Sequence, residues 1–287
     1  MARQLDRAGN VITVREDVTF LDKIHHVHMS DVHLDSPACD RALFHRHMKE
    51  ADALGAIVQI NGDLFDAMQG RDDPRRSMSD LKALYKVDNY IDALVKDVAD
   101  ELRPYKQVSY IIGLGNHETS ILKHNGTNLC EGVAMLLRMD GIQAISAGYY
   151  SWVRVMAFSG KRRSDSILTY AHHGMGGNSP VTRGVIDTSR QGVYLDGVDV
   201  VVNGHNHQNY HVALRSATVN RGGREVYKTM HYLRTPGYKV GGIESGNEHG
   251  FDVEKHPEPL PRGCAFLTYG MHEQWVLAVD SVDMKLV

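Results

Sequence analysis

Five short segments of the chain carry side chains that could bind metal ions, and each follows an apolar run. They are Asp31-Val-His33, Gly62-Asp63, Gly115-Asn116-His117-Glu118, His172-His173 and Gly204-His205-Asn206-His207. Together they offer enough oxygen and nitrogen donors for two adjacent divalent metals. A pair of metals about 3.5–4 Å apart promotes in-line displacement at phosphorus. The segments therefore indicate a hydrolase of phosphate esters.

Alternating strands and helices are expected to hold these side chains together. Up to about residue 145, the pattern predicts strands at 24–29, 56–60 and 108–114, and helices at 40–54, 78–102 and 128–138. Beyond residue 148 the chain is rich in Val, Tyr and Thr, which predicts strands at 149–158, 166–171, 198–202, 210–219, 226–233, 264–269 and 274–279. We expect an α/β fold in which the first half forms one mixed, helix-flanked sheet and the last half contributes a second.

Each candidate ligand lies where a predicted strand gives way to a loop, which is where open α/β sheets place their ligand crevices. Asp31 and His33 are two residues apart, as are His205 and His207, so an extended strand end would point each pair to one face. Carboxylate, imidazole and amide donors suit Mn, Fe or Zn, and the lack of thiolates argues against a structural zinc site. Asp63 is the natural bridging carboxylate. One such pair arises often by chance, but five in this order do not.

Composition and length limit the class of protein. The 287 residues could form one large α/β domain or two small ones, and the net charge of −3 requires any polyanion site to be a local patch. Three separated cysteines without CxxC spacing indicate free thiols in a reducing compartment. The sequence predicts neither a signal peptide nor a membrane span, so we expect a cytoplasmic protein with no membrane partner. We expect a single domain over residues 1–287, with a long loop or lid insertion at about 235–262.

The five segments resemble the motifs of the calcineurin-like metallophosphoesterase superfamily, over roughly residues 24–210. The resemblance implies a four-layer αββα sandwich of two mixed β-sheets flanked by helices. It implies that one metal is held by Asp31, His33, Asp63 and His207. It implies that the other is held by Asp63, Asn116, His172 and His205. The ligand is His172 rather than His173 because the family uses the first histidine after the strand.

The resemblance also implies two residues for proton transfer. His117 would face the leaving group as general acid, and Asp66 would hydrogen-bond this histidine and raise its pKa. A turn or helix-cap aspartate is the alternative for Asp66. His173 is either a substrate contact or filler.

The substrate is indicated less sharply than the reaction. Asp31-Val-His-Leu-Asp-Ser-Pro37 and Gly62-Asp-Leu-Phe-Asp66 are most similar to Mre11/SbcD-type exonucleases. Glu118 is instead usual in protein Ser/Thr phosphatases, but those follow the second Asp with an arginine, and here Ala67 stands there. Basic residues that could favour a polyanion are Lys123, Arg162 and its neighbours Lys161 and Arg163, and Arg71, Arg75 and Arg76.

These patterns predict a binuclear phosphodiesterase or nuclease acting on DNA, RNA or a nucleotide, with His173, Arg162 and Lys123 as substrate contacts. Two divalent ions would be bound, with Mn expected and Fe, Zn or Ni as alternatives. Relatives of this compact size suggest a virus- or phage-encoded protein acting in the host cytoplasm. A phosphomonoesterase is the second hypothesis. A metal-free scaffold is the third, and the complete ligand set argues against it.

Overall fold

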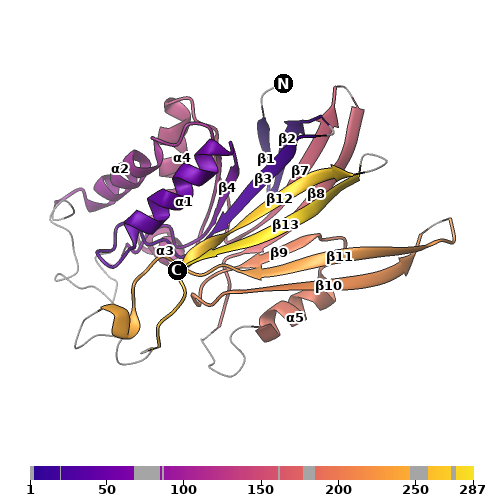
Figure 1. The fold of residues 1–287 in the computed structure, drawn as a ribbon. Coiled ribbons are helices and arrows are strands. Elements are labelled where there is room, and N and C mark those ends of the chain that lie inside the picture. The colour runs from indigo at the N-terminus through magenta and orange to yellow at the C-terminus, as the bar shows by residue number, and fades with distance from the viewer. Residues whose placement is uncertain are drawn as a thin grey trace.

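A computed structural model places two β-sheets face to face, with helices on the outer faces (Figure 1). The structure describes residues 3–19, 21–67, 85, 87–160, 162–176, 185–220, 222–245, 258–272 and 276–287. No helix among them is both long and apolar enough to cross a membrane.

The first sheet has the order β13-β12-β3-β4-β5-β6. Four of its strands are parallel: β3 (Lys23–Met29), β4 (Ile57–Asn61), β5 (Ser109–Gly113) and β6 (Ala144–Ser146). β12 (Gly263–His272) adds antiparallel to β3, and β13 (Val276–Leu286) pairs antiparallel with β12. Every residue of β4 and β5 is buried, as expected of parallel strands covered on both faces.

The second sheet has the order β1-β2-β7-β8-β9-β11-β10. Its strands are β1 (Gln4–Ala8), β2 (Val11–Asp17), β7 (Tyr150–Ser159), β8 (Arg162–His172), β9 (Val200–Asn203), β10 (Tyr210–Val219) and β11 (Glu225–Arg234). β2 is parallel to β7, and β9 is parallel to both β8 and β11, so this sheet is also mixed. The expected division of the chain between the sheets was wrong, because β12 and β13 join the first sheet and β1 and β2 join the second.

Three apolar cores separate four layers. One core packs the first sheet against α1 (Arg41–Ala53), α2 (Tyr90–Leu102) and α4 (Leu129–Met139). The second fills the space between the sheets, where Ile57 and Ile111 meet residues such as Val155 and Val200. The third lies on the outer face of the second sheet, beside α5 (Val185–Tyr194). The predicted αββα architecture is confirmed.

Some elements differ from the expected ones. The sequence pattern did not predict β1, β2, β6, α5 or the helix α3 (Asn116–Asn125) that begins at the third motif. The helix expected at 78–102 is described from Tyr90, and residues 78–84 and 86 lie outside the described residues. α3 begins there because the Glu118 carboxylate accepts a hydrogen bond from the Gly115 amide at 2.7 Å, which closes the first turn.

Candidate metal centre

The ends of five strands bring their polar side chains into three overlapping groups. Within each group the possible ligand atoms lie within 4.8 Å of one another. β3, β4, β5, β8 and β9 each supply one of the five segments, so residues far apart in sequence meet beyond one edge of the sandwich. The first group is Asp31, His33 and His207; the second is His33, Asp63 and His117; the third is Asp63, His173 and His205.

Of the two adjacent histidines, His173 lies in the cluster, and His172 does not. The His173 Nε2 atom is 3.2 Å from Asp63 Oδ2 and 3.1 Å from Asn116 Oδ1. Its Nδ1 lies 2.9 Å from the Asn61 carbonyl oxygen, which fixes the ring. The His172 Nδ1 instead accepts a hydrogen bond from the Gly174 amide at 2.9 Å. The geometry thus favours His173 over the expected His172 as a ligand.

The spacing of donor atoms fits a metal coordination shell. Metal–ligand bonds of about 2.1 Å place neighbouring ligands about 3.0–3.4 Å apart in octahedral or tetrahedral geometry. Asn116 Oδ1 is 2.9 Å from His205 Nδ1, and His173 Nε2 is 3.1 Å from Asn116 Oδ1 and 3.2 Å from Asp63 Oδ2. Asp31 Oδ1 is buried without a hydrogen bond and is 3.6 Å from His207 Nε2. This carboxylate oxygen is buried, receives no hydrogen bond and faces an imidazole nitrogen. A cation bound between the two atoms would satisfy both.

At this centre a positively charged histidine side chain balances buried carboxylates. Burial lowers the pKa of His173, but the carboxylates of Asp63 and Asp31 outweigh burial and raise this pKa to about 10. Burial raises the pKa of Asp63, but the charges of His173, His117 and His33 outweigh it and hold this pKa well below its usual range. A protonated His173 therefore balances a buried carboxylate in the metal-free protein.

The backbone at the centre is strained. Asp31, His33, Asp63, His205 and His207 all have positive φ, between 50° and 76°. A left-handed conformation costs a residue with a side chain roughly 1–2 kcal/mol. Strain of this kind persists only where the surroundings over-determine the backbone, and it gathers at functional sites.

Two buried carboxylates hold the strained loop after β4. Glu118 is fully buried and accepts hydrogen bonds from the amides of Gly115, Asp63 (3.1 Å) and Phe65 (2.9 Å). Burial and the neighbouring Asp63 charge raise the pKa of Glu118 to about 7. Asp35 accepts from the Asp66 and Ala67 amides at 2.5 and 2.8 Å. Sequence reasoning missed Asp35, although its place two residues past His33 was a signal.

His117 projects into the centre from the start of α3. Its Nδ1 lies 2.5 Å from the Asp66 backbone oxygen and so donates to it, which turns Nε2 toward Asp63 Oδ2, 3.9 Å away. The Asp66 carboxylate is 4.0 Å from this Nδ1 but only 3.0 Å from Nδ1 of His33. Burial lowers the pKa of His117, and Asp63 and Asp66 only partly offset burial. Asp66 thus positions His117 through its carbonyl, and its carboxylate orients His33, contrary to the expected side-chain contact.

Two expected substrate contacts do not lie at the centre. Arg162 begins β8, whose other end is His172, and ten residues at about 3.3 Å each separate them by roughly 33 Å. Lys123 is exposed near the end of α3, seven residues or about 10 Å along the helix from Asn116. Lys161 and the basic residues at 71, 75 and 76 lie outside the described residues.

No protein-family model matches the sequence, and neither does any curated protein. Two similar solved structures are Vps29 of Chaetomium thermophilum and GAP50, the anchor in the inner membrane complex of Plasmodium. Each is 10% identical over 92% of this chain. Vps29 is covered over 96% of its length with a TM-score of 0.36, and GAP50 over 84% with a TM-score of 0.42. Neither likeness bears on the chemistry of the centre.

The first part of the expected lid is built into the wall of the centre. Residues 235–240, here called the strap, follow β11, and the Tyr238 amide donates to the Asp31 carbonyl at 3.0 Å. A Cβ on Gly237 would lie 2.6 Å from His207 Nδ1, so only glycine allows this approach. A short 3-10 helix follows at Gly242–Ser245, and residues 246–257 lie outside the described residues.

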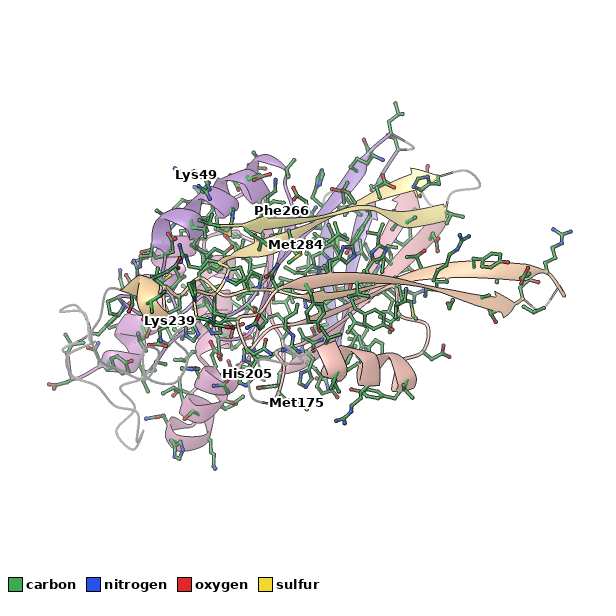
Figure 2. The ribbon with its side chains drawn as sticks, turned by 60° about the horizontal axis from the view of Figure 1, so that its bottom comes forward. Lys49, Met175, His205, Lys239, Phe266 and Met284 are labelled. Carbon is green, nitrogen blue, oxygen red and sulfur yellow. The ribbon has the colours of Figure 1, made fainter. Side chains whose placement is uncertain are left out.

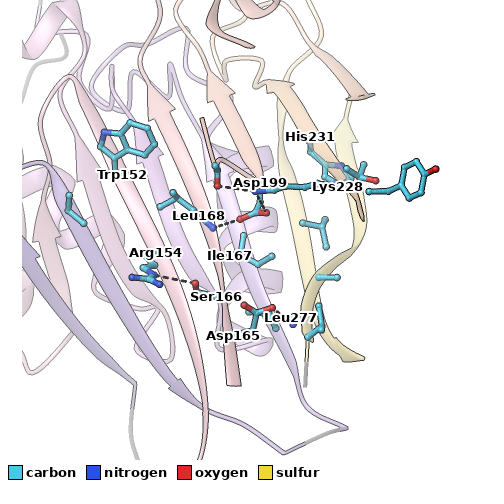
Figure 3. Close-up of a pocket in the computed structure, with 17 residues that line it drawn as sticks. Trp152, Arg154, Asp165, Ser166, Ile167, Leu168, Asp199, Lys228, His231 and Leu277 are labelled. Atoms are coloured by element: carbon cyan, nitrogen blue, oxygen red, sulfur yellow. Dashed lines mark hydrogen bonds and ion pairs between the residues drawn. The ribbon is translucent and has the colours of Figure 1, made fainter. Parts of the chain in front are cut away.

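A separate cavity of about 1020 Å³ opens between β7, β8, β11 and β13 (Figure 3). None of the candidate ligands lines it. Its charged groups already have partners, since Lys228 pairs with Asp199 at 2.9 Å and Arg154 donates to the Ser166 hydroxyl at 3.2 Å. We assign it no part in the chemistry.

Proposed function

We propose that this protein is a metal-dependent phosphoesterase with two metal sites that share Asp63. The observation that carries the proposal is the overlap of three groups of possible ligands in one cluster, two of which share the Asp63 carboxylate, with His117 beside it. One site would be formed by Asp31, His33, Asp63 and His207. The other would be formed by Asp63, Asn116, His173 and His205. Mn²⁺ suits these donors, as do Fe, Zn and Ni.

When bound, two such metals supply a nucleophilic hydroxide near neutral pH and neutralise charge on the phosphoryl oxygens. His117 is held by the Asp66 carbonyl so that Nε2 faces the reacting group, and in its protonated form it donates to the leaving oxygen. The Asp66 carboxylate lies 3.0 Å from His33 Nδ1 and so favours a proton on this nitrogen, which would leave Nε2 for a metal.

Nucleic acids or nucleotides, as phosphodiesters, are the substrates we propose. The exonuclease-like spacing of Asp31, His33, Asp63 and Asp66 supports this choice. Glu118 was the residue that favoured a protein phosphatase. Its buried hydrogen bonds to the Asp63 and Phe65 amides give it a structural role, so its presence does not favour a phosphatase substrate. A phosphomonoesterase remains the competing function.

The test is a substrate panel with metal add-back. Purified protein, stripped and reloaded with Mn²⁺, would be assayed on single- and double-stranded DNA, RNA, bis-p-nitrophenyl phosphate and p-nitrophenyl phosphate. We expect diester turnover that Asp63→Asn abolishes. Turnover of monoesters alone would overturn the diester assignment. A metal-loaded protein that hydrolyses no ester would overturn the proposed function.

A further inference from the structure

The strap places a cation at the His33–His117 side of the centre. Lys239 Nζ is 3.4 Å from Asp66 Oδ1, the oxygen that lies 3.0 Å from His33 Nδ1 and 4.0 Å from His117 Nδ1. Figure 2 shows Lys239 near the same end of the molecule as His205. One carboxylate oxygen therefore stands between the ammonium and two rings, that of the histidine that we assign to proton donation and that of one proposed metal ligand.

The backbone around Lys239 is fixed on both sides. The Tyr238 carbonyl accepts from the Asp40 amide at 2.7 Å, and the Val240 amide donates to the Ala38 carbonyl at 2.8 Å. The Tyr238 ring is fully buried, and its hydroxyl lies 2.9 Å from His47 Nδ1. The lysine stem thus starts from a rigid point, while its side chain keeps 25% of its exposure and can reach an incoming ligand.

Residues 62–67, the described start of the loop after β4, contain no lysine or arginine. Ala67, which follows Asp66, is buried and carries no charge. The Asp66 carboxylate lies 3.0 Å from His33 Nδ1 and 3.4 Å from Lys239 Nζ, so it faces both groups. A phosphoryl group next to His117 would bring further negative charge to within reach of the ammonium, which binds anions as a compact point charge.

We propose that Lys239 is a phosphate-binding residue of this centre, and that its ammonium contacts a phosphoryl oxygen of the substrate. This inference rests on the proposed phosphoesterase function. The strap thereby supplies, from a segment far along the sequence, a cation beside the first residues of the loop after β4, where residues 62–67 carry none.

Inorganic phosphate is the probe, titrated by calorimetry into Mn²⁺-loaded protein. Lys239→Met is expected to weaken phosphate binding about tenfold, which corresponds to about 1.4 kcal/mol, with metal content unchanged. Lys239→Arg should recover part of the affinity. Lys285→Met is the matched control, because Lys285 is similarly exposed and is paired with Glu50 and Asp283 away from the centre. In turnover assays, Lys239→Met should raise KM more than it lowers kcat.

Unchanged phosphate affinity in Lys239→Met would overturn the inference. Loss of metal in this variant would also overturn it, because Lys239 would then act on the ligands through Asp66. The two proposals fail separately. A wild-type protein that binds phosphate in a Lys239-dependent way but hydrolyses no ester refutes the function alone. An active enzyme that is indifferent to Lys239→Met refutes the phosphate contact alone.

Discussion

Replacing each of the adjacent histidines by alanine tests the assignment of His173 as a ligand. The structure makes the two substitutions very unequal. His173→Ala removes a fully buried imidazole that contacts Asp63, Asn116 and Asn61, whereas His172→Ala removes a partly buried ring that accepts one hydrogen bond.

The expected magnitudes follow from these contacts. Breaking the buried His173–Asp63 pair should lower the free energy of unfolding of the metal-free protein by about 3–5 kcal/mol at pH 7. Loss of the single hydrogen bond to His172 should lower it by about 0.5–1.5 kcal/mol. The His173 contribution is present in full below pH 6.5 and is lost as pH rises toward 10, because folding raises the pKa of His173 to about 10.

Urea unfolding at several pH values and metal counting by mass spectrometry would measure both effects. His173→Ala should also lower the bound metal from two ions to one per chain, while His172→Ala should keep both. A His172→Ala protein that loses metal beside a His173→Ala protein that retains two ions would refute the assignment and favour His172 as the ligand.

Three other predictions concern the rest of the centre and the core. His117→Asn should keep its metals but slow kcat by about 10²–10⁴, most for poor leaving groups, and metal loss in this variant would contradict its role as an acid. Glu118→Ala leaves three buried amides without an acceptor and should lower the free energy of unfolding by at least about 3 kcal/mol in urea melts; a change within error would show that water replaces the carboxylate. Burial lowers the pKa of His28 to about 3, so the stability that its neutral form allows should be complete above pH 6.5 and should fall by up to about 1.4 kcal/mol per pH unit as pH drops toward 3. His28→Gln should flatten this slope, and an unchanged slope would assign it to other groups.

The sequence predicted the convergence of the ligands because strand ends and metal donors follow local rules. It did not predict which of His172 and His173 faces the centre. Side chains alternate along β8, and two successive residues of this strand, Thr169 and Tyr170, are both buried because layers cover both faces of the sheet. Without a solvent-exposed face, the run 167–171 carries no alternation of apolar and polar residues that would set the register.

The remaining misses concern contacts between distant segments. Pairing of β12 with β3 joins the two ends of the chain, and pairing of β2 with β7 joins its beginning to its middle. No local pattern records such pairing. The preference of the Asp66 carboxylate for His33 depends on differences of about an ångström. Arg162 was chosen for its charge, and only the length of β8 shows that it is remote.

The left-handed backbone of His205 and His207 sets stability against activity at these two positions. Glycine adopts this conformation without the strain that a side chain brings. In a mutational scan that selects only for folding of the metal-free chain, glycine should therefore be enriched at both histidines, whereas Asp63 should be retained because its carboxylate pairs with His173. A scan that selects for turnover should reject glycine at both histidines. The difference between the two scans would mark this part of the centre without any structure or ligand.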